Sequence, residues 1–202
     1  MFKPSLLLCA FLSAGALSGA QAATAWDEST SGDFANVGTS PTGVSLGLGS
    51  NLILGTTGRT DGVVDRDYFT FTLAEGWQLD SITLLPGTTF LGPSGLGFIG
   101  VQAGSQMTVN PTGGDPSALL GWWHYNENDI NTDILPLVGQ GGGAIGFVGA
   151  LPAGSYTFWI QETATGLADY RMDFGVSVVP EPSIALMLMA GLVGVGVLRR
   201  RG

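Results

Sequence analysis

The chain has little cysteine, histidine or positive charge. Its 202 residues include one cysteine, Cys9, and one histidine, His124. A single cysteine cannot form an internal disulfide, and zinc coordination would need further thiol or imidazole ligands that the sequence does not contain. We therefore expect a domain that is stabilised by a packed core, in which His124 packs among its aromatic neighbours.

Positive charge is scarce over residues 23–179, which carry three arginines and fifteen carboxylates for a net charge of −12. Such a polyanion repels nucleic acid and anionic lipid, so no nucleic-acid partner is expected. The carboxylates have two readings, either as solvated surface and turn residues or as ligands of an extracellular calcium ion.

The amino-terminal segment has the three parts of a secretion signal. Lys3 supplies charge, residues 6–17 form an apolar run too short to span a bilayer, and Ala20 and Ala22 offer small side chains to signal peptidase. The sequence predicts cleavage after Ala22 by signal peptidase. Cys9 follows a leucine and lies too early for a lipoprotein signal, so lipidation is not expected. One domain over residues 23–179 remains.

The carboxyl-terminal segment has three ordered parts. The motif Pro180, Glu181 and Pro182 comes first, an uncharged span over residues 183–198 follows, and Arg199, Arg200 and Arg201 precede the last glycine. As a helix the span would reach about 24 Å, slightly less than the ~30 Å hydrocarbon core. The arginines predict a transmembrane helix with its carboxyl end in the cytoplasm and the domain outside. The alternative is a buried helix of a soluble domain.

This order of motif, span and basic end over residues 180–202 resembles the PEP-CTERM sorting tag of Gram-negative bacteria. The resemblance implies that an exosortase, a membrane-embedded transpeptidase-like enzyme, recognises the Pro-Glu-Pro region and releases or transfers the protein to the cell surface or extracellular matrix. The chain is then a substrate of exosortase and is anchored in the inner membrane as a precursor; the sequence leaves open whether the tag is finally removed or stays as an anchor. The tag indicates where the protein goes and gives no information on the function of the domain.

Residues 23–179 have a pattern typical of an all-β domain, with many glycines and short segments in which apolar and polar residues alternate. The clearest strands are predicted at residues 170–178, 155–161, 67–73 and 77–85, and weaker ones at 46–54, 96–103, 106–110, 119–125 and 144–148. The strands at 155–161 and 170–178 are expected to pair as an antiparallel hairpin. Eight or nine strands predict a single antiparallel β-sandwich.

Two segments, residues 65–76 and 151–158, carry a second resemblance. Their Asp-x-Asp-x-Phe strand and Pro-x-Gly-x-Tyr strand are similar to those of pre-peptidase carboxyl-terminal domains. That family implies a jelly-roll-like β-sandwich that accompanies secreted proteases and surface proteins.

Two acidic loops are candidate calcium sites. Asp65 and Asp67 stand two apart at a strand start with Asp61 on the preceding loop, and Asp129, Asn131 and Asp133 form a second group. Oxygen ligands at such spacings suit calcium. The second group is not an EF-hand, because Ile134 replaces the required glycine and Gln140 the closing glutamate. The competing reading is that Asp and Asn favour turns by bonding to backbone amides.

The function that these features favour is a non-enzymatic surface or matrix protein that serves adhesion, biofilm or surface-coat structure. The first alternative is a carbohydrate-binding module, in which Trp122, Trp123 and Trp159 would be exposed on one sheet face and stack on extracellular polysaccharide. The second is a surface hydrolase, which would need two carboxylates facing each other in a concave pocket, one with a perturbed pKa.

Overall fold

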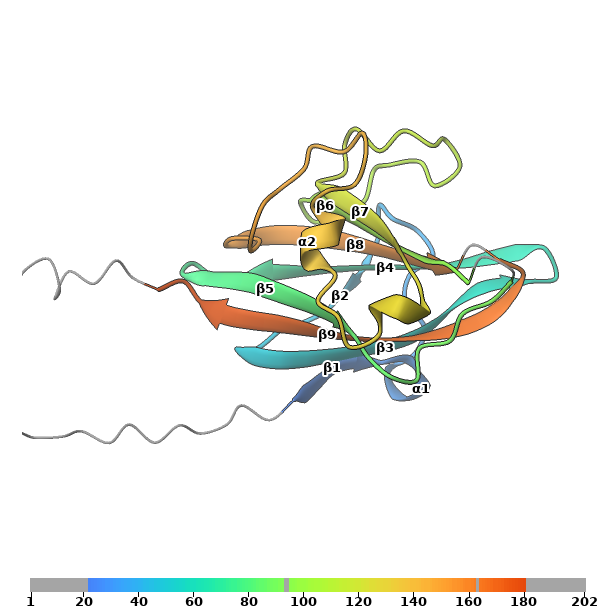
Figure 1. Cartoon of the computed structure of the whole chain (residues 1–202), viewed down its shortest axis with the longest axis horizontal. Helices are drawn as coiled ribbons and strands as arrows, with labels where there is room; N and C mark the ends of the chain where they lie inside the picture. Colours follow the sequence, from blue (N-terminus) through green and yellow to red (C-terminus); the bar gives the residue numbers. More distant parts are fainter. Residues whose placement is uncertain (1–21, 93–94, 163, 181–202) are drawn as a thin grey trace, which may run out of the picture.

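The computed structural model describes residues 22–92, 95–162 and 164–180 (Figure 1). The predicted signal peptide up to residue 21, Glu181, Pro182, the span 183–198 and the arginines 199–201 lie outside the described residues. Pro180 is exposed and belongs to no helix or strand. Within the described ranges, no helix has both the length and the apolar character that crossing a membrane requires.

In the described residues nine strands form one curled sheet, so the predicted all-β class is confirmed. The strands are β1 (Ala23–Asp27), β2 (Thr42–Gly43), β3 (Gly49–Thr60), β4 (Val63–Leu73), β5 (Trp77–Leu84), β6 (Gly97–Ala103), β7 (Gly121–Tyr125), β8 (Gly154–Glu162) and β9 (Gly166–Val178). Their order is β5-β9-β3-β4-β8-β6-β7, with β1 beside β3 and β2 beside β4. All pairs are antiparallel except β1–β3 and β2–β4. The helical turns are α1 (Glu28–Ser31), η1 (Glu127–Asp129) and α2 (Leu135–Val138).

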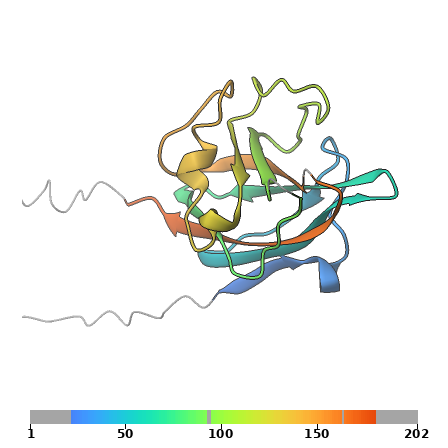
Figure 2. The same cartoon turned by 45° about the vertical axis from the view of Figure 1, so that its right-hand side comes forward.

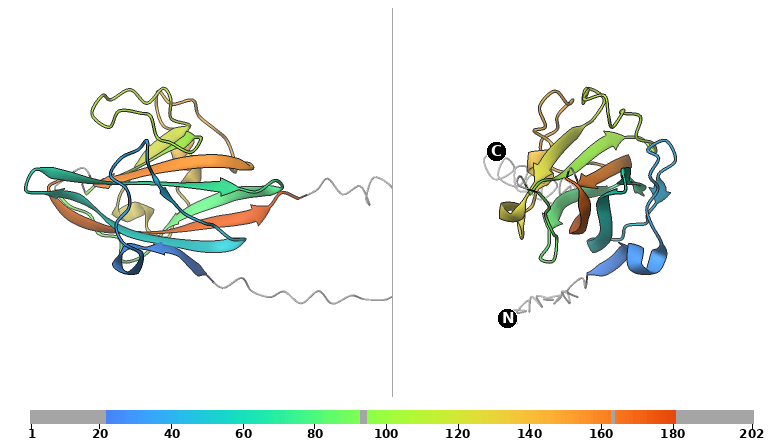
Figure 3. Two further views of the ribbon diagram at one scale, coloured as in Figure 1. Left: turned by 180° about the vertical axis from the view of Figure 1, so that it is seen from behind. Right: turned by 90° about the vertical axis from the view of Figure 1, so that its right-hand side faces the viewer.

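The β3–β4 hairpin joins the two halves of the sheet. The two strands pair only near their tip, from Thr60↔Val63 to Gly58↔Asp65, and then diverge. β3 continues beside β9, whereas β4 continues beside β8 (Figure 3). The two halves then face each other, and the main core lies between them because alternate side chains of each strand point inward.

The predicted hairpin between residues 155–161 and 170–178 is wrong. β8 pairs with β4 and β6, whereas β9 pairs with β3 and β5, so the short link after Glu162 crosses from one half of the sheet to the other. Each strand has a hydrogen-bonded neighbour on both edges, which leaves no free edge for the strand that follows it in sequence. The alternating apolar residues of β9 from Tyr170 to Val176 are buried, but Val178, the next in the alternation, is 56% exposed.

The strands predicted at residues 106–110 and 144–148 are also wrong, because both segments are loops. In the second loop Gly143, Gly146 and Gly149 adopt positive φ, which interrupts an extended strand. Both loops lie over the outer face of β6 and β7 (Figure 2). The other seven predicted strands exist with shifted ends; the one predicted at 46–54 is β3, Gly49–Thr60.

A second, smaller apolar cluster lies under these loops on the outer face. Its buried members are Tyr68, Met107, Leu119 and Trp159. Tyr68 and Trp159 are Cα partners on β4 and β8 and stack at 5.9 Å, while Met107 and Leu119 belong to the covering loop. The half of the sheet that contains β8 is therefore apolar on both faces.

The segment from β1 to β2 runs along the edges of β3 and β4, at the back of the molecule in Figure 1 (Figure 3, left). Phe34 fixes this segment, since its ring is 2% exposed and lies 5.1 Å from the rings of both Trp26 and Phe69. The segment thereby closes the side of the sheet where β3 and β4 diverge.

Candidate functional site

The divergence of β3 and β4 leaves a fork on the edge of β3. β1 pairs with β3 as far as Leu54, and β4 pairs with it only from Gly58 onward. Between them, the backbone N–H of Thr56 donates to Oε2 of Glu28 at 2.7 Å, and the N–H of Phe34 donates to Oε1 at 3.0 Å. The carboxylate of Glu28 therefore takes the place of a strand partner in the fork.

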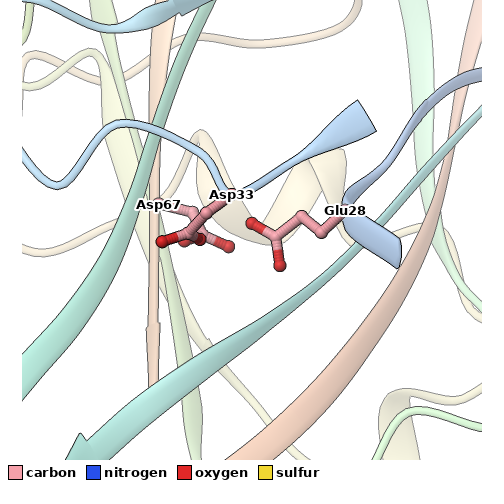
Figure 4. A group of neighbouring side chains, drawn as sticks. All are labelled: Glu28, Asp33 and Asp67. Atoms are coloured by element: carbon pink, nitrogen blue, oxygen red, sulfur yellow. The ribbon is translucent and has the colours of Figure 1, made fainter. Parts of the chain in front are cut away.

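Two further carboxylates converge on Glu28 at this fork. One oxygen each of Glu28, Asp33 and Asp67 lies within 4.8 Å of the others (Figure 4). The three side chains come from α1, from the loop that follows it, and from β4. Asp33 is exposed, Glu28 is half-buried, and Asp67 is fully buried. Asp65 lies nearby, where its Oδ1 accepts a hydrogen bond of 3.1 Å from Asn36 Nδ2.

Asp67 and Tyr170 bring unsatisfied polar atoms to this cluster. Neither carboxyl oxygen of Asp67 has a hydrogen-bond partner among the described residues, and the same holds for the hydroxyl of Tyr170, which is 2% exposed. The hydroxyl lies close enough to lower the pKa of Asp67, although the pair lacks hydrogen-bond geometry. Gly55 is the Cα partner of Tyr170, and a Cβ at Gly55 would overlap the phenol ring.

Burial and mutual repulsion raise the pKa values of the cluster. Burial, with the charge of Glu28 next in size, raises the pKa of Asp67 to about 9. Burial also raises the pKa of Glu28 to about 7, against the effect of the Phe34 and Thr56 amides. The pKa of Asp65 is raised by burial and by the charge of Asp33. No basic side chain in the described part of the chain offsets these shifts at Asp67 or Glu28.

The structure brings together only two of the three residues of the first predicted calcium group. Asp67 belongs to the cluster and Asp65 lies beside it, but Asp61 lies on the exposed turn at the tip of the β3–β4 hairpin, with φ of 52°. Sequence reasoning missed Glu28 and Asp33, which lie more than thirty residues before Asp67. No local spacing connects them, because only the docking of the β1–α1 segment on β3 brings them to β4.

In the second predicted calcium group, both carboxylates bind backbone amides. Asp129 Oδ2 accepts from the N–H of Asn126 at 2.9 Å, and Asp133 Oδ1 accepts from Ile82 at 2.9 Å and from Leu135 at 3.1 Å. Asn131 takes a positive φ of 64°. These bonds match the alternative reading of the loop, in which acidic and amide side chains stabilise turns.

An aromatic pocket of about 220 Å³ opens on the outer face of β6, β7 and β8. In its wall the Phe98 ring lies 4.5 Å from Trp159, 6.2 Å from Trp122 and 5.4 Å from His124. The loop residues Val109, Asn110, Pro111, Asp115 and Pro116 line the other side. Two of the residues that line the pocket have buried ring nitrogens, His124 Nδ1 and Trp159 Nε1, without a hydrogen-bond partner among the described residues.

The three predicted stacking tryptophans do not form one exposed row. Trp159 is only 7% exposed, and Trp122, on the same face, is half-buried with its Nε1 donating to the carbonyl of Gly142 at 3.0 Å. Trp123 packs against the main core on the opposite face. Gly100 lies between Trp159 and Trp122 in the cross-strand row, and Phe98 fills the space above it.

A polar cavity of about 260 Å³ adjoins the acidic cluster. Asp27, Glu28, Asp169, Tyr170 and Arg171 contribute its charged and phenolic groups. Glu28 and Tyr170 therefore line the cavity and also lie at the acidic cluster.

Comparison of the chain with models of protein families, with curated proteins and with solved structures found no match.

Proposed function

We propose that this protein is a non-enzymatic, exported component of the cell surface or extracellular matrix that serves adhesion, biofilm or surface-coat structure. Signal peptidase removes residues 1–22, and exosortase acts on the tag at 180–202. The observation that carries the proposal is the ordered series of Pro180, Glu181 and Pro182, an apolar span and Arg199–Arg201 at the end of a domain that begins after a secretion signal.

The arrangement of the domain supports this proposal. The start of β1 and the end of β9 lie toward the same end, and the tip of the β3–β4 hairpin lies at the other (Figure 1). The N–H of Val179 donates to the carbonyl of Gly76 at 2.7 Å, so the ordered chain reaches the start of the tag. A tether at residue 180 would leave the hairpin tip free. We also propose that the domain is a jelly-roll-like β-sandwich of the pre-peptidase carboxyl-terminal type.

The intact mass of the protein from surface and matrix fractions tests the sorting step. In a host with exosortase, we expect loss of residues 1–22 together with the segment beyond Pro182. In a host without exosortase the segment should be retained, as it should be in a Glu181→Ala variant of the normal host. A carboxyl-terminal segment retained in both hosts would refute sorting and leave a membrane-anchored domain.

A second candidate function, binding of matrix polysaccharide, is favoured by the aromatic pocket. The rings of Phe98 and Trp122 offer apolar faces for a sugar, and Asn110 and Asp115 add polar side chains to the lining. The pocket replaces the flat row of tryptophans that the sequence suggested. A sugar unit that enters it would contact Phe98 and Trp122 between the sheet and the loop at residues 109–116.

Two adjacent tryptophans on opposite faces provide a matched test of this candidate. Oligosaccharides cut from the host's own matrix polysaccharide are titrated into the wild-type protein and into Trp122→Phe and Trp123→Phe. Binding in the pocket predicts a loss of affinity in Trp122→Phe of about fivefold, equal to about 1 kcal/mol, and no change in Trp123→Phe. Equal effects in the two variants would refute pocket binding.

A further inference from the structure

We infer that Glu28, Asp33 and Asp67 together bind one calcium ion, which fastens the β1–α1 segment to β4 at the fork. This site goes beyond the proposed surface function and does not depend on the sorting tag. It differs from both groups of acids that the sequence suggested, since two of its three carboxylates lie outside them.

The spacing of the oxygens suits calcium. Calcium binds oxygen at 2.3–2.6 Å, so two ligands on opposite sides of the ion stand about 5 Å apart. The three carboxylate oxygens of the cluster lie within 4.8 Å of one another, which one calcium ion can bridge with little movement. Magnesium binds at 2.0–2.1 Å in a strict octahedron, so its opposite ligands stand only about 4.2 Å apart. Calcium also accepts irregular coordination by carboxylates, whereas magnesium dehydrates reluctantly and keeps several waters, so a cluster of three carboxylates fits calcium better.

A second, independent observation is the set of unsatisfied atoms aimed into the cluster. Asp67 is fully buried with two oxygens that lack a hydrogen-bond partner among the described residues, and the buried Tyr170 hydroxyl also has none. Buried polar groups are normally satisfied, and a buried carboxylate is normally paired with a cation or bound to a metal. A calcium ion would satisfy Asp67 directly, and Tyr170 supplies a neutral oxygen beside it.

Glu28 is already oriented to be a ligand. Its two oxygens accept the N–H groups of Thr56 and Phe34, which fix the carboxylate in the fork. Each carboxylate oxygen has a second lone pair that stays free for a cation. Backbone amides thus hold this ligand in the way that outer-shell hydrogen bonds orient the ligands of metal sites.

The site is open to solvent at Asp33, which is exposed, and Glu28 also lines the polar cavity of about 260 Å³. Calcium takes six to eight oxygen ligands, so water from the cavity completes the coordination that three carboxylates begin.

The experiment uses the full chain in mild detergent, stripped of metal with EDTA and then dialysed. Calcium binding is measured by titration calorimetry, and the midpoint of thermal unfolding, Tm, is measured with and without 10 mM calcium or magnesium. The variants are Asp33→Asn, which changes an exposed ligand, and Asp67→Asn, which changes the buried one. Asp61→Asn is the matched control, because it removes one negative charge from the hairpin tip and asparagine also tolerates positive φ.

We expect a dissociation constant of about 10⁻⁴ M, as in extracellular calcium modules, and a rise in Tm of about 5–10 °C in 10 mM calcium. Asp33→Asn should weaken calcium binding at least about tenfold and Asp61→Asn should leave it unchanged. Because Asp33 is exposed, its variant reports on the site even where Asp67→Asn folds poorly. Absence of calcium binding, an equal response to magnesium, or equal binding by Asp33→Asn and the wild type would each overturn the inference.

Discussion

The stability of the metal-free protein should fall steeply with increasing pH, because Asp67 is buried without a cationic partner. In EDTA, we predict that ionisation of Asp67 lowers the free energy of unfolding by about 4 kcal/mol between pH 5 and pH 8. The Asp67→Asn variant should lack this part of the pH dependence.

The magnitude follows from the pKa of Asp67, which rises from 3.8 to about 9 on folding. Between these values the native state holds one proton that the unfolded state has lost, so stability falls by about 1.4 kcal/mol per pH unit. Stability from a raised acid pKa is complete below the unfolded pKa and is lost as pH rises toward the folded pKa. Over three units the loss is about 4 kcal/mol, and Glu28, with a pKa of about 7, adds to it in the same direction.

Urea unfolding followed by tryptophan fluorescence at several pH values measures this dependence. The wild type, Asp67→Asn and Asp61→Asn are compared in EDTA, and only the difference between each variant and the wild type is interpreted, so groups shared by all three cancel. Asp61→Asn should track the wild type. Parallel curves for the wild type and Asp67→Asn would refute the reasoning. Saturating calcium should flatten the wild-type curve, because the ion replaces the proton.

Three further substitutions test the packing, and urea unfolding midpoints check each. Phe174→Ala should cost about 3–5 kcal/mol, since this fully buried ring lies edge-on to the phenylalanines of β4 and β8. Gly121→Ala should cost about 1–3 kcal/mol, because its Cβ would overlap the backbone carbonyl of Val138. Asp133→Ala should cost about 1–2 kcal/mol, since the N–H groups of Ile82 and Leu135 lose their acceptor, whereas Asp133→Asn should restore most of it.

Alternation of apolar residues predicted the strands well, because it reports which face of a strand is buried. β9 and β8 were predicted to within a few residues, and their inward side chains, such as Phe158 and Phe174, are in the core. Alternation carries no information about which strand lies beside which. A short link between two strands favours a hairpin, yet the link after β8 spans the two halves of the sheet. The longer-range partners on both edges of each strand decide the pairing.

For the candidate metal site too, the sequence predicted only the residues that are neighbours along one strand. Asp65 and Asp67 could be singled out because they are two apart on one strand. Glu28 and Asp33 could not, since their approach depends on the parallel pairing of β1 with β3 and on the anchoring of Phe34 in the core. The aromatic pocket was not predicted: Trp122 and Trp159 share a face, but Trp123 lies on the other, and Phe98 and the loop that covers the pocket emerge only from the folded structure.

A calcium ion in the fork would act as the cross-link that a chain with one cysteine cannot make as a disulfide. It would join Glu28 to Asp67 and close a loop of about 40 residues, for which the chain-entropy model gives a stabilisation of about 4 kcal/mol. Unlike a disulfide, the link is lost in EDTA. The structure should then open first where the β1–α1 segment meets the fork between β3 and β4.

The backbone amides of Phe34 and Thr56 report on that place, since both donate to the carboxylate of Glu28. Removal of calcium should speed their hydrogen exchange more than that of the Ile53 amide, which lies within the pairing of β3 with β1 and β9. Uniform acceleration of all three amides would mean that calcium stabilises the whole domain and does not specifically hold the β1–α1 segment.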